Sequence, residues 1–360
     1  MSRDLPPAGR LPILFFGMIS LFGGSLAGLA RLGWQLPAAS AAGWHGALMI
    51  SAFFGTVISL ERAVALGRAW AYLAPACAGS AGLILLAGGN PLLAQLLSLT
   101  AAGIMLAASG YVLQRQTALF TVVLAIAVAC WLGGNLFWLL DGHLTRAVPW
   151  WLAFLVLTIA GERLELTRFL PTPPLARQLF MAIVATLLAG AAISSIDESN
   201  GLKLFAGTLI ALALWLLRYD IARRNAWLAG LPRFIALCLL SGYAWLLAAG
   251  LLGLAGALQA GHPWRDAALH CIGLGFVFAM VFGHAPIIFP AVTRIRIPYH
   301  PSLYLPLALL HLSLALRIAG SLSGAFALRQ QAGLLNALVL LTFIATLLIL
   351  IRRNPDRGTP

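Results

Sequence analysis

The sequence predicts an all-α membrane protein, built as a polytopic helical bundle of about twelve transmembrane helices. Of its 360 residues, 61% are hydrophobic and only 9% are charged, whereas about a quarter of the residues in an ordinary soluble domain are charged. Apolar runs of about 20 residues recur along the whole chain, and each can cross a hydrocarbon core of about 30 Å. We therefore expect a single integral membrane domain over residues 1–360.

Gly, Pro and charged residues mark the boundaries of the predicted spans. We expect spans at residues 11–30, 44–66, 70–88, 91–113, 118–140, 147–167, 175–195, 201–218, 233–258, 266–290, 301–321 and 331–351. The first run continues to Ala30 without a small-residue cleavage site, so we interpret it as a retained span and not as a signal peptide. Spans 2 and 6 both end with a Glu-Arg pair, and three four-helix units would place these two spans in equivalent positions. The alternative is that Glu-Arg is a common way to end a helix at the membrane interface.

The distribution of basic residues predicts the orientation of the chain. Most of the 23 Lys and Arg residues lie in one set of alternating gaps between spans, and the other set holds only Arg31, Arg146, Lys203, Arg265 and Arg329. Because positive residues accumulate on the cytoplasmic side of membranes, this imbalance favours an even number of spans and two cytoplasmic termini. The net charge of +13 then reflects topology, and we expect no nucleic-acid partner.

Five of the ionisable residues inside the predicted spans or at their ends are candidates for a functional site. His45 opens span 2, His270 begins span 10, His284 lies near the cytoplasmic end of span 10, and His311 and Arg317 lie within span 11. An Arg at the centre of a membrane helix costs about 2.5–3.5 kcal/mol on insertion scales, so such residues are functional candidates by default. The spacing of His270 and His284 puts both on one side of a helix, about 21 Å apart along its axis.

His45 and His270 are expected near the same outer surface, where they can serve as axial ligands of one haem. Asp266 precedes His270 by one helical turn, and its carboxylate can accept the second ring N–H of that histidine. Two simpler interpretations stand beside this one. His45 can be an interfacial histidine that bonds water or lipid, and Asp266 can be a first-turn acid that complements the helix N-terminus.

His284 and His311 are the less certain pair of predicted ligands, because they differ in depth by about 9 Å at the rise of an α-helix. They can hold copper or a second haem, and Met49 and Met280 add soft thioether groups near the histidines. The alternative is that the histidines form interhelical hydrogen bonds, worth about 0.6 kcal/mol on average, and that the methionines fill the core. Arg317 can pair with a haem propionate or extend to the outer headgroups.

Three motifs carry a resemblance to a known family: H-x4-G-x4-M at His270, Gly275 and Met280; Trp44-His45 with Met49; and Ala315-Leu316-Arg317. In these motifs the chain resembles the NnrS-like haem- and copper-containing membrane proteins of the bacterial nitric-oxide response. It is also distantly similar to the haem-copper oxidase superfamily. The resemblance implies haem b, copper as a further metal, and nitric oxide as a small gaseous ligand. It also implies a location in the bacterial inner (cytoplasmic) membrane.

The chain departs from both groups at specific positions. Gly46 and Ala47 stand where the NnrS-like proteins usually have a second histidine and a glutamate. The adjacent His-His pair and the His-x-His pair of the oxidases are absent from the sequence, so we do not expect oxygen reduction by that chemistry. The usual metal constellation of the family is therefore not assumed for this chain.

The sequence leaves three functions open. The first is a haem-binding protein of the lipid bilayer, with or without copper, that binds or processes nitric oxide through histidines of spans 2, 10 and 11; a haem-dependent redox enzyme is one form of it. The second is a di-haem electron carrier or quinol oxidoreductase with a quinol or other electron donor, although no second span has a matching histidine pair. The third is a cofactor-free transporter with a histidine proton relay, whose helices would break at Gly-rich runs.

Overall fold

The computed structural model describes residues 4–167 and 173–353, and within them helices are the regular secondary structure, with no strand. Twelve of the helical segments are long and apolar enough to cross a membrane. They are Pro7–Arg31, Ala47–Leu66, Ala69–Leu86, Pro91–Arg115, Leu119–Asp141, Ala147–Thr167, Pro174–Ser194, Glu198–Tyr219, Leu231–Leu254, Arg265–Thr293, Pro301–Leu322 and Phe326–Arg353. The predicted all-α bundle is confirmed, and each predicted span has its counterpart.

Contacts along the chain gather into two compact units, and not into three four-helix units. Unit 1 comprises Met1–Thr158 and Ile288–Ile295, and unit 2 comprises Ile159–Ile287 and Arg296–Pro360. Two helices, α6 (Ala147–Thr167) and α12 (Ala279–Thr293), contribute residues to both units.

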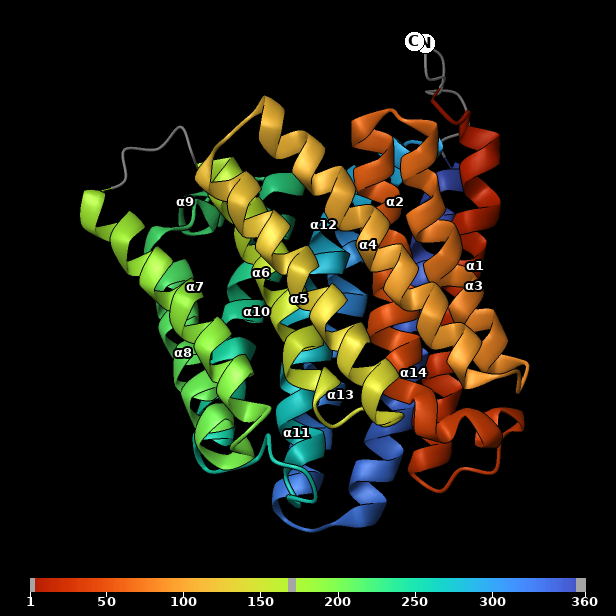
Figure 1. The fold of residues 1–360 in the computed structure, drawn as a ribbon, viewed down its shortest axis with the longest axis vertical. Helices are drawn as coiled ribbons and strands as arrows, with labels where there is room; N and C mark the ends of the chain where they lie inside the picture. The colour runs from red at the N-terminus through yellow and green to blue at the C-terminus, as the bar shows by residue number, and fades with distance from the viewer. Residues whose placement is uncertain (1–3, 168–172, 354–360) are drawn as a thin grey trace. The chain divides into compact units, whose positions relative to one another are not determined.

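Unit 1 otherwise contains α1 (Pro7–Arg31), η1 (Pro37–Trp44), η2 (Ala47–Phe54), α2 (Gly55–Leu66), η3 (Ala69–Tyr72), α3 (Leu73–Leu86), α4 (Pro91–Arg115) and α5 (Leu119–Asp141). Its helix α1 packs against α3 and η2, and α4 packs against α3 and α5 (Figure 1). A buried polar network joins η2 to α5, because Ser51 donates to Asn135 at 2.9 Å and Trp131 donates to Ser51 at 3.1 Å. Asn135 in turn donates to the Ser98 carbonyl at 2.9 Å. The buried side chains of Ser51, Trp131 and Asn135 therefore find their hydrogen-bond partners within unit 1.

Unit 2 otherwise contains α7 (Pro174–Ser194), α8 (Glu198–Tyr219), α9 (Ala222–Asn225), α10 (Leu231–Leu254), α11 (Arg265–His270), η4 (Cys271–Phe278), η5 (Pro301–Leu303), α13 (Tyr304–Leu322) and α14 (Phe326–Arg353). Helix α8 packs between α7 and α10, and α13 packs against α14 and η4. Gly275 lets η4 approach α10 closely, because a Cβ atom there would lie 2.5 Å from the Cβ atom of Trp245.

The two spans that begin with candidate histidines both contain a π-helical stretch of eight residues. In span 2 it is η2, which follows His45, and in span 10 it is η4, which follows His270 directly. π-helical residues make up well under 1% of residues in globular proteins, and they occur frequently at functional sites. The sequence pattern predicted ordinary α-helix in both places.

The helices are not broken where the transporter interpretation expected it. Gly23 and Gly24 lie within continuous α1, and Gly133 and Gly134 lie within continuous α5. At the remaining Gly-rich run, Gly88-Gly89, helix α3 does end, and Gly88 has a φ of +69°. Helix breaks at Gly23-Gly24 and Gly133-Gly134, which would have supported the transporter alternative, are therefore not found.

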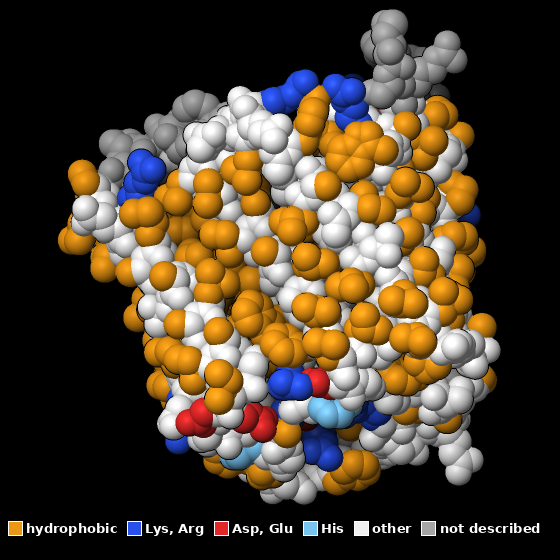
Figure 2. All heavy atoms as spheres, viewed as in Figure 1, with side chains coloured by type: hydrophobic (Ala, Val, Ile, Leu, Met, Phe, Trp, Pro, Cys, Tyr) orange, Lys and Arg blue, Asp and Glu red, His pale blue; other side chains and the backbone are white. Residues whose placement is uncertain are grey.

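The surface agrees with a membrane environment. On the face drawn in Figure 2, hydrophobic side chains cover the sides of the helices, and Lys, Arg, Asp and Glu side chains gather toward the helix ends. Large hydrophobic side chains are exposed along several helices, among them Phe15, Leu140 and Leu312, which are 61%, 69% and 60% exposed. Such exposure suits contact with lipid chains better than contact with water.

Candidate metal-binding histidines

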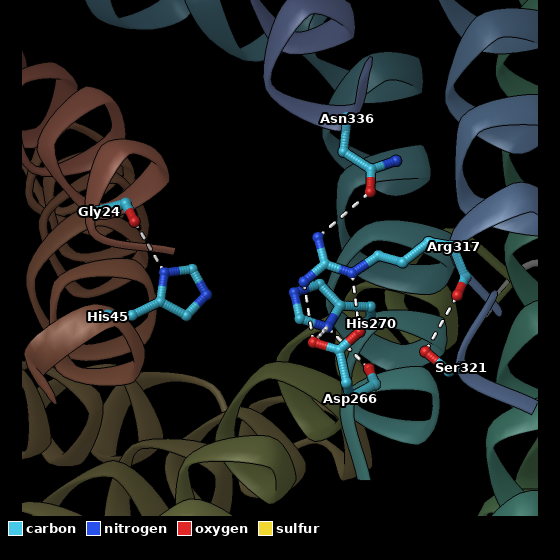
Figure 3. A network of polar contacts seen from close by, with 7 residues as sticks. All are labelled: Gly24, His45, Asp266, His270, Arg317, Ser321 and Asn336. Atoms are coloured by element: carbon cyan, nitrogen blue, oxygen red, sulfur yellow. Dashed lines mark hydrogen bonds and ion pairs between the residues drawn. The ribbon is translucent and has the colours of Figure 1, made fainter. Parts of the chain in front are cut away.

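His45 is held in place by helix α1 of its own unit. Its Nδ1 atom lies 2.7 Å from the carbonyl oxygen of Gly24 (Figure 3). The ring also packs on Gly28, where a Cβ atom would lie only 2.8 Å from its Cε1 atom. Because a carbonyl oxygen can only accept, Nδ1 carries the proton and the lone pair of the neutral ring is on Nε2.

His270 has the same hydrogen-bonding arrangement in unit 2. Its Nδ1 atom lies 2.7 Å from the main-chain carbonyl of Asp266 and 3.4 Å from the Asp266 carboxylate (Figure 3). The sequence predicted a contact between these residues one turn apart, and the structure adds the main-chain carbonyl as the closer acceptor. The lone pair of the neutral His270 ring is again on Nε2, which is the state in which histidines usually bind metals.

The main partner of Asp266 is Arg317, which is only 6% exposed. Arg317 donates from Nε and Nη2 to the two Asp266 carboxylate oxygens, both at 2.8 Å, and from Nη1 to Asn336 at 3.3 Å. Asn336 also donates to Ser313 at 2.8 Å. Figure 3 shows the guanidinium group between Asp266 and Asn336.

This pairing changes the interpretation of Arg317. A haem propionate or the lipid headgroups were the partners expected from the sequence, whereas Asp266 already neutralises the charge of Arg317 with a bidentate contact. Bidentate Arg–carboxylate pairs are strong and geometrically specific. Arg317 therefore holds Asp266, and through it the start of the helix that carries His270.

Both ring nitrogens of His284 have partners. Nδ1 lies 2.7 Å from the Met280 carbonyl, and Arg163 directs its Nη1 atom at Nε2 from 3.5 Å. The lone pair of His284 thus faces a guanidinium cation, which would repel a metal ion in the same place. A metal at His284 stays a prediction, and the arrangement found here does not favour it.

His311 carries its ring proton on the other nitrogen than His45, His270 and His284, which all carry it on Nδ1. Trp245 donates its indole N–H to Nδ1 of His311 at 2.9 Å, and the two rings stack. Since Nδ1 accepts, the neutral ring carries its proton on Nε2, which is buried without a hydrogen-bond partner among the described residues. His311 must lose or move that proton before Nε2 can bind a metal. The interhelical hydrogen bond that was the alternative is present, and a metal at His311 stays a prediction.

Three functional-site candidates escaped the sequence analysis: Arg163, Asp220 and Tyr243, which gather near His284. Arg163 and Asp220 lie 3.4 Å apart, between Nε and Oδ2, and both are buried. The sequence suggested that Arg163 merely ends span 6 at the interface. Asp220 gave the one available signal, because acidic residues are rare in this chain, which has 10 of them, and Asp220 lies two residues after a predicted span.

No larger metal cluster is present in the part of the chain that the structure describes. Within residues 4–167 and 173–353, no group of three or more His, Cys, Asp or Glu side chains is arranged to hold a metal ion. Haem iron differs from such a site, because the porphyrin supplies four ligands and the protein supplies one or two. The tautomers of His45 and His270 fit that requirement, and copper stays a prediction.

The long apolar helices, with an ion pair enclosed between two of them, define a multi-pass α-helical membrane protein. A family model matches residues 10–352, and the chain belongs to that family, which is described as a domain of unknown function (DUF8744). No curated protein matches the chain.

Proposed function

We propose that this protein binds haem b in the membrane, with His45 and His270 as axial ligands of iron. One observation carries the proposal: each of these histidines donates Nδ1–H to a main-chain carbonyl and so presents the lone pair of Nε2. Metal-binding histidines almost always donate their other ring N–H to a carbonyl, a carboxylate or water, which fixes the tautomer and the orientation of the ring.

The surroundings of the two histidines support the same proposal. Each precedes a π-helical stretch, a conformation that frequently marks functional sites. Gly28 leaves space for the His45 ring, and the Gly24 carbonyl accepts its Nδ1–H. The Asp266–Arg317 pair fixes the start of α11 beside His270, and within the pair the two charges cancel.

The biological activity that we propose is the binding or processing of nitric oxide, in a bacterial inner membrane with both termini cytoplasmic. This step depends on the resemblance of His270, Gly275 and Met280, and of Trp44-His45, to the NnrS-like proteins. Haem would supply the ligand-binding and redox chemistry, and the protein would supply axial ligands and a dry environment. Turnover would also need a quinol or another electron donor, and copper would be a further cofactor.

The experiment is to add nitric oxide to the reduced, detergent-purified protein and to follow its absorption spectrum. A change in the spectrum at one nitric oxide per haem is expected if one axial histidine is labile. A haem spectrum that does not respond to nitric oxide would contradict the gas-binding function and leave a closed electron carrier. Retention of the full spectrum after both His45→Ala and His270→Ala would contradict the ligand assignment.

A further inference from the structure

A second group of polar side chains is buried in unit 2, and the haem proposal does not use it. Arg163 comes from α6, Asp220 directly follows α8, Tyr243 comes from α10 and His284 comes from α12. Arg163, Asp220 and Tyr243 are 3%, 5% and 0% exposed. Four segments that are distant in sequence thus bring two opposite charges, a phenol and an imidazole to one place.

The contacts within this cluster are too long to satisfy its polar atoms. Charge-assisted N–H···O bonds are typically about 2.7–2.9 Å long, whereas Arg163 Nε lies 3.4 Å from Asp220 Oδ2 and Arg163 Nη1 lies 3.5 Å from His284 Nε2. The Tyr243 hydroxyl has Asp220 as a nearby hydrogen-bond acceptor and Arg163 as a nearby charge. Even so, Tyr243 Oη, Arg163 Nε and Asp220 Oδ2 are all buried without a hydrogen bond of ordinary geometry among the described residues.

The two charges at the centre of the cluster, on Arg163 and Asp220, balance, which favours a neutral missing partner over an ion. Arg163 and Asp220 compensate each other, and His284 is in a neutral tautomer because it donates from Nδ1 and accepts at Nε2. The other titratable groups nearby are Glu162 on α6, which interacts with His284, and Cys238 on α10, which packs on Gly283. Because the unsatisfied atoms are an N–H donor, a carboxylate acceptor and a hydroxyl, the partner that fits them both donates and accepts hydrogen bonds.

We propose that Arg163, Asp220, Tyr243 and His284 form a hydrated site inside unit 2, with water as the ligand. Water can accept from the Arg163 N–H, donate to Asp220 and exchange a hydrogen bond with the Tyr243 hydroxyl, and buried water typically makes two to four such bonds. Asp220 also accepts from the Ala222 backbone N–H at 2.6 Å. The site therefore begins at the end of a membrane span, where water is available. This inference does not depend on haem binding.

The test is hydroxyl-radical labelling of the full-length protein in detergent by pulsed X-ray radiolysis, read by mass spectrometry. Radicals form where water is bound, so a buried side chain beside bound water is modified faster than an equally buried side chain in an apolar core. Phe234 and Phe205 are the internal controls, because they are 0% exposed, as Tyr243 is. We expect Tyr243 to be modified about tenfold faster, because buried water stays in contact with its polar partners. Equal rates for the three rings would overturn the proposal.

A double variant, Arg163→Leu with Asp220→Leu, tests which groups hold the water. It removes both charges together, so neither is left unpaired. We expect the labelling of Tyr243 to fall to the rate of Phe234, while Trp227, which is 91% exposed, keeps its rate and reports on folding. Unchanged fast labelling of Tyr243 in a folded double variant would contradict the assignment of the site to Arg163 and Asp220. If the variant does not fold, the comparison within the native protein decides alone.

Discussion

Unit 2 contains two groups that share a His, an Asp and an Arg, and they are built in opposite ways. At the start of α11, Asp266 receives two hydrogen bonds of 2.8 Å from Arg317 and lies beside His270. At the end of α8, Arg163 stands between Asp220 and His284, with contacts of 3.4 and 3.5 Å. In the first group Asp266 contacts both Arg317 and His270. In the second group Arg163 contacts both Asp220 and His284.

The difference follows from how the residues are placed on the helices. Asp266 and His270 lie one turn apart on α11, so only Arg317 of α13 must be positioned across a helix contact. Arg163, Asp220 and His284 come from three separate elements, and no two of them have a fixed local relationship. The first group is therefore preorganised and holds a histidine with its lone pair on Nε2, whereas the second leaves room for water.

The largest expected difference between the two groups concerns haem. Replacing His270 with Ala removes a proposed ligand, so we expect at least a tenfold loss of bound haem, in line with the 10–100-fold effects of disturbing metal sites. Replacing His284 with Ala removes a ring that already faces Arg163, so haem content should stay within about twofold of the native protein, because no ligand is lost. Haem content per chain, measured on purified variants, checks both; equal losses would remove the distinction between the two histidines.

The next largest difference concerns stability. Arg317→Leu leaves the Asp266 carboxylate without its bidentate partner, and we expect the free energy of unfolding to fall by about 3 kcal/mol. Arg163→Leu also leaves a buried carboxylate, but the proposed water and the Ala222 N–H still donate to Asp220, so we expect a loss of about 1–2 kcal/mol. Unfolding in mixed micelles with increasing sodium dodecyl sulfate provides the comparison. A larger loss for Arg163→Leu would show that the α8 cluster is the tighter of the two.

A smaller contrast concerns the uncharged members of the groups. Asn336→Leu removes an acceptor from Arg317 and a donor to Ser313, and we expect a destabilisation of about 1–2 kcal/mol. Tyr243→Phe removes a hydroxyl whose expected partner is water, so the free energy of unfolding should change by about 0.5 kcal/mol or less. The same unfolding assay applies, and a strongly destabilised Tyr243→Phe variant would indicate a direct protein partner for that hydroxyl.

The smallest effect is expected at an exposed acid, which serves as a reference for both groups. The Asn200 backbone N–H and side-chain amide donate to Asp197 at the start of α8, and these bonds lower the pKa of its carboxyl below the ordinary 3.8. A lowered pKa stabilises the fold above the unfolded-state value and loses that contribution as the pH falls through the folded-state value. Thermal unfolding should therefore depend slightly on Asp197 below about pH 4. In Asp197→Asn, which keeps an accepting oxygen, this dependence should disappear; if it persists, it belongs to another group.

The sequence was sufficient for the spans but not for the pairing of residues between them. Apolar length and basic residues predicted twelve spans within a few residues, because the membrane imposes those lengths on any helix. Helical spacing also brought Asp266 to His270. Arg317 with Asp266, and Arg163 with Asp220, depend instead on packing between helices that are 51 and 57 residues apart in the chain. Nothing in the local pattern around Arg163 distinguishes a buried cation from an interfacial one.

The proton positions of the histidines could not be predicted for the same reason. His45 depends on the Gly24 carbonyl in another helix, and His311 depends on the Trp245 indole. The π-helical stretches after His45 and His270 were missed because apolar periodicity does not distinguish a π-helix from an α-helix in a run that is hydrophobic on every side. The four predicted histidines were therefore indistinguishable as ligands until their hydrogen bonds were known.

The most direct test of the central claim is the absorption spectrum of the purified protein, recorded together with its iron content. The account predicts a Soret band, with haem b as the extracted cofactor and at least one iron per chain. It further predicts that the band is lost when His45 and His270 are both replaced by Ala, and kept when His284 and His311 are both replaced. A protein purified without a Soret band and without iron, after expression with sufficient haem, would contradict the account.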